Sequence, residues 1–272
     1  MKLIEPSVEL IEQESSLEGI YKQIEKAGRI CYKSEDKITE NSAKKFVDML
    51  IKNGHRAMLE HGTVYLKFPD NIDYINLSIK YNSNPYSIIK WDKFIGKDAG
   101  AHVTTNYRVL VENNWLDDLQ YLCEPTEYHE KRYTLKFITS IGITRELIRH
   151  RHFSFANEST RYCNYSRKGT EFIIPQWYKG DNAENDKECS MQSEFEVTCE
   201  QAEASYNRFI EWGAKPQEAR EILPMCTKSE IIVTGFESDW KNFLKLRCAK
   251  DAHPDIQYLA NKVKEYFPVA IY

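Results

Sequence analysis

The chain has 272 residues, 42% hydrophobic and 29% charged, with a formal net charge of −4. This composition argues against disorder, and the acidic balance argues against a broad nucleic-acid-binding face. The sequence shows no apolar run of membrane-spanning length, no signal-peptide pattern and no C-x-x-C pair among its seven cysteines. We therefore expect a cytoplasmic protein with reduced thiols that binds neither a membrane nor nucleic acid.

The first half of the chain is predicted to combine helices and strands. Helical spacing predicts a helix after the cap residue Ser16, carrying Leu17 to Ala27, and a second helix over 46–51 that ends at Gly54. Alternating apolar residues predict strands over 63–68 and 133–137, which are candidates for one sheet.

Residues 69–131 have weak periodicity and are rich in Asn, Tyr and Asp. We interpret them as an insertion, partly helical at 107–111 and 116–122, into one domain that spans residues 1–272.

The second half is predicted to be mainly helical. Thr144 is a candidate cap for a short helix over 145–150, and either Ser238 or Asp239 is a candidate cap for a helix carrying Trp240. The other predicted elements are a strand at 172–174, a helix over 195–209 closed by Gly213, a helix from Pro216 to Pro224, a strand or extended link at 229–235, and a last helix from Pro254.

Residues 149–162, RHRHFSFANESTRY, carry most of the chemical information. From Arg145 to Lys168, six cationic side chains face only two carboxylates, although the whole chain is acidic. Arginine forks, hydroxyls and amides together suit a phosphate, so the segment predicts a site for a small phosphorylated ligand. The alternative is a surface helix end held by salt bridges.

Other readings of the same segment are weaker. His150 and His152 lack a third ligand nearby, so we expect no metal site. Ser159 lies among arginines and not beside a base, which favours a phosphate ligand over a nucleophile. Cys163 and Cys248 lie near the segment, but small core cysteines are the better interpretation.

These motifs, taken in their order along the chain with three further segments, resemble those of the flavin-dependent thymidylate synthases. The resemblance rests on Arg149-His150-Arg151 followed by Ser159 and Arg161-Tyr162, and on the segments NGHRAMLEH (53–61), PQEAREILP (216–224) and NFLKLR (242–247). It implies an α+β fold in which helices flank a central antiparallel sheet, assembled as a homotetramer with sites between subunits. It also implies an enzyme that binds FAD and methylates dUMP to dTMP, using methylenetetrahydrofolate and NADPH.

The resemblance also implies roles by position. The dUMP-binding residues would be Glu146, Arg149, Asn157, Ser159, Thr160, Arg161, Arg220 and Arg247. The FAD-binding residues would be His55, Glu60, Arg149, His150, Arg151, Asn157 and Asn242. Arg247 would be catalytic, because a guanidinium against the uracil ring stabilises its anionic form.

This sequence departs from the family pattern at several of these positions. Asn157 stands where a Glu is common, Glu146 stands where a Gln contacts uracil, and Phe236 with Ser238 replaces an Asn-x-Arg pattern. The alternative to an enzyme is a non-catalytic nucleotide- or RNA-binding protein that uses the same arginines and stacking tyrosines.

Overall fold

The computed structural model describes residues 1–69, 72–91, 100–167 and 169–267. Its strands are β1 (Lys2–Ile4), β2 (Ser7–Ile11), β3 (Thr63–Pro69), β4 (Ile88–Trp91), β5 (Gly100–Asn106), β6 (Arg132–Ser140), β7 (Ser154–Asn157), β8 (Glu171–Ile173) and β9 (Lys228–Phe236). Its α-helices are α1 (Leu17–Ile30), α2 (Ala43–Lys52), α3 (Tyr74–Asn82), α4 (Tyr107–Glu112), α5 (Ile141–Leu147), α6 (Asp186–Glu211), α7 (Pro216–Ala219), α8 (Glu237–Arg247) and α9 (Pro254–Val263).

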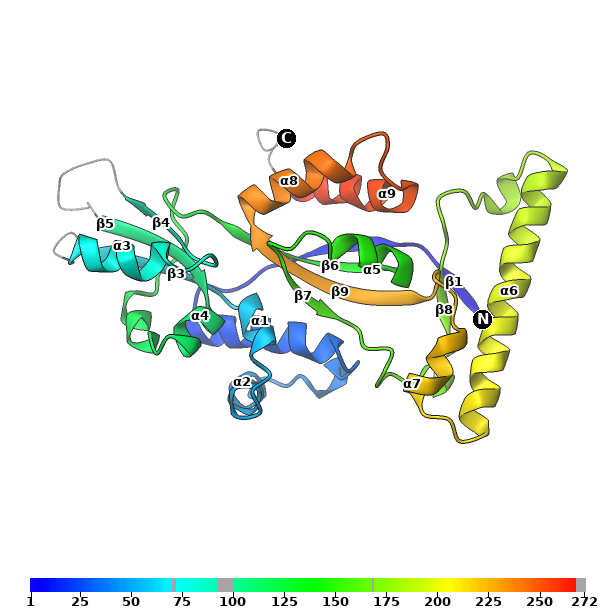
Figure 1. Cartoon of the computed structure of the whole chain (residues 1–272), viewed down its shortest axis with the longest axis horizontal. Coiled ribbons are helices and arrows are strands. Elements are labelled where there is room, and N and C mark those ends of the chain that lie inside the picture. The colour runs from blue at the N-terminus through cyan, green and yellow to red at the C-terminus, as the bar shows by residue number, and fades with distance from the viewer. Residues whose placement is uncertain (70–71, 92–99, 168, 268–272) are drawn as a thin grey trace.

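A four-stranded antiparallel sheet in the order β2-β6-β9-β7 forms the middle of the molecule (Figure 1). Alternate residues of its long strands face opposite sides, so each face buries a different layer. On one side Phe137 and Val233 pack with Trp240 and Phe243 of α8 and with Leu259 of α9. The predicted combination of antiparallel sheets and helices is confirmed.

The opposite face of this sheet is covered by α1 and by the 3-10 helix η2 (Arg56–His61). Ala27 and Ile30 of α1 form a small buried cluster with Ala156 of β7 and Ile232 of β9. Helices α8 and α9 therefore lie on one side of the sheet and α1 and η2 on the other, as Figure 1 shows for α1 and α8.

A second sheet, antiparallel and three-stranded, has the order β3-β5-β4. The prediction that 63–68 and 133–137 share a sheet is wrong, because β3 pairs with β5 and β6 pairs with β2 and β9. Strand β5 comes from the 69–131 segment, and its Val103 is fully buried with Ile24 and Leu50. The segment thus completes a core that α1 and α2 begin.

Several elements that were predicted from local sequence patterns are confirmed by the structure. Ser16 caps α1 by accepting the Gly19 N–H at 2.9 Å, as predicted. The helical stretches predicted at 107–111 and 116–122 are confirmed as α4 and the 3-10 helix η3 (Leu116–Tyr121). Pro216 and Pro254 each occupy the first turn of a helix.

Other boundaries differ from the predictions. Ser140 caps α5, so the helix begins before Thr144, whose hydroxyl instead donates to the Ile141 carbonyl within it. The cap position of α8 is occupied by Phe236, and not by Ser238 or Asp239 as predicted. Asp239 lies within the first turn of the helix and accepts the Phe236 N–H at 3.0 Å. Helix α6 starts earlier than expected, after the cap residue Asn185. Residues 228–236 form a strand, not a link.

Strands β1 and β8 form a small parallel pair, an addition to the antiparallel arrangement that was expected. Within the described ranges, none of the helices is both long and apolar enough to cross a membrane.

Candidate functional site

The ends of α5 and α8 meet at a cluster of four predicted site residues. Arg247, the last residue of α8, donates from Nε to His150 Nε2 at 2.9 Å and from Nη1 to Glu146 Oε2 at 3.0 Å. Its Nη2 donates to the Glu146 carbonyl at 3.0 Å. Arg149 lies on the solvent side, with Nη1 3.8 Å from Glu146 Oε1 and 71% of its side chain exposed.

His150 is neutral in this cluster. Burial, followed by the charge of Arg247, lowers the pKa of His150 from 6.5 to about 4. The neutral ring accepts the Arg247 N–H through Nε2, which leaves the proton on Nδ1. The histidine therefore orients the guanidinium and adds no competing charge.

Arg247 keeps donors for a ligand. A guanidinium carries five N–H groups, and the three hydrogen bonds use one from each nitrogen. Among the described residues, one N–H on Nη1 and one on Nη2 have no hydrogen-bond partner, so each can donate to a ligand. The three hydrogen bonds orient the side chain, and 17% of it remains exposed.

A second cluster contains three of the residues predicted to bind dUMP, namely Thr160, Arg161 and Arg220. Arg220 Nη1 donates to Thr160 Oγ1 at 3.2 Å, and Arg161 Nε donates to Gln217 Oε1 at 3.2 Å. Both arginines are exposed at the surface. Two guanidiniums and a hydroxyl, drawn from two segments far apart in the sequence, form a group that can bind a phosphate.

Asn157 and Ser159 lie on the chain that joins the two clusters. Asn157 ends β7 and its Oδ1 accepts the Ser229 hydroxyl at 3.0 Å. The Ser159 backbone N–H donates to the Cys31 carbonyl, and its own carbonyl accepts the N–H groups of Tyr162 and Cys163. The Ser159 turn therefore presents Thr160 and Arg161 at the surface.

A cavity of about 700 Å³ lies beside the second cluster. Its lining includes Tyr162 and Pro216, the neighbours of Arg161 and Gln217, together with Tyr32, Lys33 and Lys228. The Tyr32 and Tyr162 rings lie 5.3 Å apart and are both about half exposed. The cavity thus offers aromatic faces next to the phosphate cluster.

Some of these residues were missed by the sequence interpretation. Gln217 lies within the segment PQEAREILP and Tyr162 within the RY pair, so the motifs carried a signal for both. No motif pointed to Tyr32 or Lys33, which reach the cavity only because the end of α1 packs against the Ser159 turn.

The residues predicted to bind FAD lie on both sides of the central sheet in one chain. Asn242 is exposed on α8, and Arg151 is exposed after α5, on the same side of the sheet as Arg247. His55 and Glu60 belong to the η2 region on the other side, where Glu60 Oε1 lies 2.5 Å from Arg108 Nη1. Phe236, one of the departures from the family pattern, is buried and packs under Arg132.

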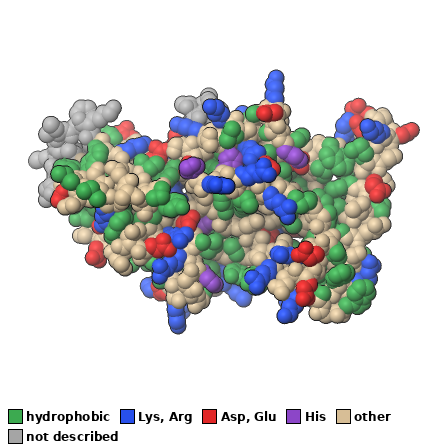
Figure 2. Space-filling view, in the orientation of Figure 1, with side chains coloured by type: hydrophobic (Ala, Val, Ile, Leu, Met, Phe, Trp, Pro, Cys, Tyr) green, Lys and Arg blue, Asp and Glu red, His purple; other side chains and the backbone are tan. Residues whose placement is uncertain are grey.

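The face shown in Figure 2 carries a group of Lys and Arg side chains with histidines near its middle, over the region of α5. This agrees with the local excess of cations around the 149–161 motif in an acidic chain. Within the described residues, no set of three or more histidine, cysteine or acidic side chains is arranged to hold a metal ion.

The thiol of Cys163 is not set up as a nucleophile. Burial, followed by the charge of Glu158, raises the pKa of Cys163 to about 11, so the thiol stays protonated near neutral pH.

Comparison with known proteins identifies one family. Residues 124–269, more than half of the chain, match the family described as thymidylate synthase complementing protein. The flavin-dependent thymidylate synthase of Corynebacterium efficiens is 31% identical over 141 residues, which are 47% of this chain and 56% of that protein. The probable flavin-dependent thymidylate synthase of Paramecium bursaria Chlorella virus 1 is 31% identical over 140 residues, which are 49% of this chain and 65% of that protein.

The aligned parts therefore span only about half to two thirds of these relatives. Among solved structures, a UMP/dUMP methylase, PolB from Streptomyces cacaoi bound with 5-Br dUMP, has a TM-score of 0.48 and 19% identity. That comparison covers 98% of this chain and 91% of the other chain.

Proposed function

The chain belongs to the thymidylate synthase complementing protein family, and from this premise we propose that it is a flavin-dependent thymidylate synthase. In this proposal it methylates dUMP to dTMP, with methylenetetrahydrofolate as the carbon donor and NADPH as the reductant of bound FAD. We propose that residues 1–272 act as one domain, since α1 contributes to both the core around β3 and the cluster beneath β9.

The observation that carries the proposal is the presence of two different arginine environments, each formed by the 149–162 segment together with a second matching segment. Arg161 and Arg220 are exposed beside Thr160 and suit a phosphate. Arg247 is oriented by Glu146 and the neutral His150, and has two N–H groups left for a ring. A nucleoside monophosphate needs both functions, one for its phosphate and one for its base.

Arg247 would act on the uracil ring. Neutral uracil is a poor nucleophile, and a guanidinium beside its carbonyl and ring nitrogen stabilises the anion, which makes carbon five electron-rich. Glu146 and His150 hold the guanidinium before the ligand arrives, so little reorganisation is needed. A reduced flavin supplies the hydride for this chemistry when it is bound.

We propose that FAD lies between subunits of a homotetramer. The positions implied for FAD lie on both sides of the central sheet, with Arg151 and Asn242 on the α8 side and His55 and Glu60 on the η2 side. In a site shared by two chains, one flavin would contact one group from each chain. Arg151 and Asn242 offer a guanidinium and an amide on one side, which suit a pyrophosphate and a flavin ring, and His55 offers an imidazole on the other.

The proposal is tested in two steps with the purified protein. First, an absorbance spectrum with flavin bands is expected, with FAD recovered on denaturation. Second, the flavin is reduced with NADPH under anaerobic conditions, and dUMP with methylenetetrahydrofolate should reoxidise it and yield dTMP. A colourless protein that binds RNA or nucleotides without turnover would support the non-catalytic alternative.

A further inference from the structure

Glu158 is a fully buried carboxylate at the start of the Ser159 turn. None of its side-chain surface is exposed, and its backbone N–H donates to the Glu230 carbonyl at 2.8 Å on the neighbouring strand β9. The residue has no role in the proposed chemistry. Because an ionised carboxylate is costly to bury, its presence here requires specific partners.

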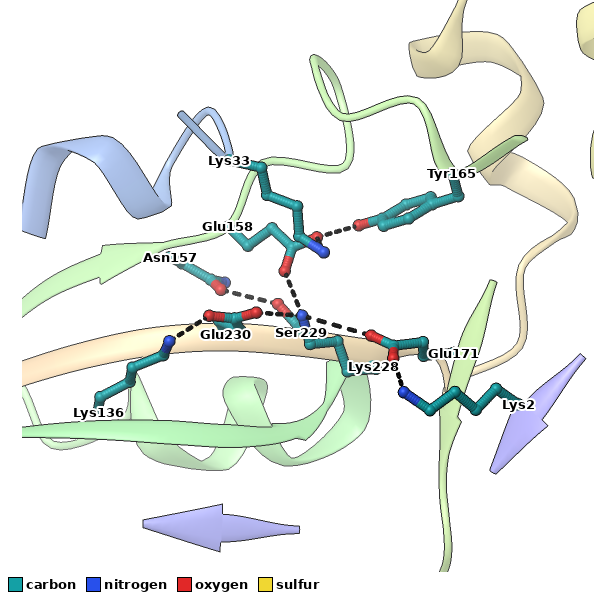
Figure 3. Close-up of polar contacts among 10 residues, drawn as sticks. All are labelled: Lys2, Lys33, Lys136, Asn157, Glu158, Tyr165, Glu171, Lys228, Ser229 and Glu230. Carbon is teal, nitrogen blue, oxygen red and sulfur yellow. Dashed lines mark hydrogen bonds and ion pairs between the residues drawn. The ribbon is translucent and has the colours of Figure 1, made fainter. Parts of the chain in front are cut away.

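Three side chains supply those partners. The Tyr165 hydroxyl donates to Glu158 Oε1 at 2.8 Å, and Lys33 Nζ lies 3.2 Å from the same oxygen. Lys228 Nζ lies 3.5 Å from Glu158 Oε2. Figure 3 shows these side chains converging on the carboxylate from the end of α1, from β9 and from the segment after the turn.

Lys228 connects Glu158 to the rest of the sheet. Only 5% of its side chain is exposed, and it contacts Glu230 and also Glu171, the latter at 3.8 Å. Glu230 is paired in turn with Lys136 at 2.7 Å (Figure 3). The charges of Lys228 and Lys33 are therefore matched by carboxylates, and the network serves to fix Glu158 in place.

The Glu158–Tyr165 hydrogen bond joins the two ends of the loop that carries Thr160 and Arg161. Inside this loop, the Tyr162 and Cys163 N–H groups donate to the Ser159 carbonyl at 3.1 and 3.0 Å. The side chains of Arg161 and Tyr162 are exposed, whereas Cys163 is buried in one cluster with Tyr206 and Ala219. In addition to these contacts, the Glu158–Tyr165 hydrogen bond closes the loop across its two ends.

We propose that Glu158 and Tyr165, held by Lys33 and Lys228, are positioning residues that keep the 159–164 loop in the form that receives a nucleotide phosphate. We call this set of four residues the loop clamp. The proposal rests on the proposed function, since it assigns the loop to the phosphate of dUMP. If the loop adopts the competent form only part of the time, the apparent Kd rises by the inverse of that fraction.

Tyr165→Phe tests the loop clamp with a minimal change, because it removes only the hydroxyl. Tyr178→Phe is the matched control, since the Tyr178 hydroxyl also donates to a carboxylate, that of Glu196 on α6, away from the loop. Binding of dUMP and of deoxyuridine to the flavin-loaded protein is measured by calorimetry. For Tyr165→Phe, Kd for dUMP should rise about tenfold, with unchanged Kd for deoxyuridine and unchanged flavin content. The control should leave all three unchanged.

Hydrogen exchange of the ligand-free protein gives a second measurement. In Tyr165→Phe the amides of Tyr162 and Cys163 should exchange faster than in the unaltered protein, while those of α6 stay the same. Equal weakening of dUMP and deoxyuridine, or unchanged loop exchange, would overturn the loop clamp. Failure of the unaltered protein to bind dUMP would instead contradict the proposed function, and loop exchange would still decide whether the clamp orders the loop.

Discussion

Two arginines of the candidate site differ in how the protein holds them. Arg247 is fixed by three hydrogen bonds to Glu146 and His150, whereas the exposed Arg161 has, within the described residues, one hydrogen bond, to Gln217. A fixed guanidinium suits a developing charge at a defined atom, and a flexible one suits a phosphate that presents several equivalent oxygens. The two residues should therefore fail in different ways when they are replaced.

Arg161→Ala should weaken dUMP binding through the loss of a charge-assisted hydrogen bond, by about 1.5–3 kcal/mol. Binding of deoxyuridine, which lacks the phosphate, should hardly change. Titration calorimetry with both ligands checks this. Equal losses for the two ligands would show that Arg161 does not bind the phosphate.

Arg247→Ala should abolish most dTMP formation and leave the fold intact. Glu146 stays partly exposed and can be hydrated when the guanidinium is removed, and His150 is already neutral. Losing one oriented donor to a developing anion costs about 2.7–4 kcal/mol, or roughly a hundredfold to a thousandfold in rate. Lys should restore only part of the rate, because it keeps the charge without the fork.

The measurement for Arg247→Ala follows dTMP formation and NADPH-driven flavin reduction separately. Flavin reduction should continue while dTMP formation falls. Near-normal dTMP formation would refute the assigned role, and an equal loss of both reactions would indicate lost flavin or a damaged fold.

At the scale of elements, a buried histidine of η2 contacts β9. His61 is completely buried, and its Nδ1 lies 2.8 Å from Thr234 Oγ1. Burial, followed by the charge of Arg132, lowers the pKa of His61 from 6.5 to about 3. Protonation of this ring therefore opposes the packing of η2, which carries Glu60, against the sheet.

The free energy of unfolding should therefore depend on acid pH. The contribution of neutral His61 is fully present above 6.5 and is lost as the pH falls toward about 3, because the unfolded chain takes up the proton first. His150, with a pKa lowered to about 4, adds a loss of the same sign in the same range. Urea unfolding at about pH 7 and about pH 4.5 measures this change.

His61→Gln is the informative variant for this prediction, because glutamine stays neutral and still offers a polar group to Thr234. It should be less stable than the unaltered protein at about pH 7, with a smaller loss of stability between the two pH values. An identical pH dependence in both proteins would show that His61 does not titrate in this way.

At the scale of the whole molecule, the positions implied for flavin lie on two sides of one sheet. If two copies of the chain complete each site, flavin binding and assembly are coupled, because dissociation removes the contacts of one subunit. We predict a tetramer that loses FAD when it is diluted or dissociated. Light scattering combined with flavin absorbance checks this, and a monomer that keeps stoichiometric FAD would contradict it.

The sequence by itself determined features that depend on neighbouring residues. Ser16 and Pro254 mark helix starts, since capping and the fixed proline backbone act within one turn. The 149–162 motif predicts an anion site from its residue types, and this stays a prediction. The family indicated by that motif is confirmed.

Tertiary structure alone decided how these pieces are combined. Strand β3 pairs with β5 and not with β6, since alternation shows that a strand exists but not which strand it pairs with. No local sequence pattern indicates that Glu158 and Lys228 are buried, and only the packing of α1, β7 and β9 brings them together. The sequence also did not show that Arg151 and His55 lie on opposite sides of the central sheet, because contacts between distant segments leave no local pattern in the chain.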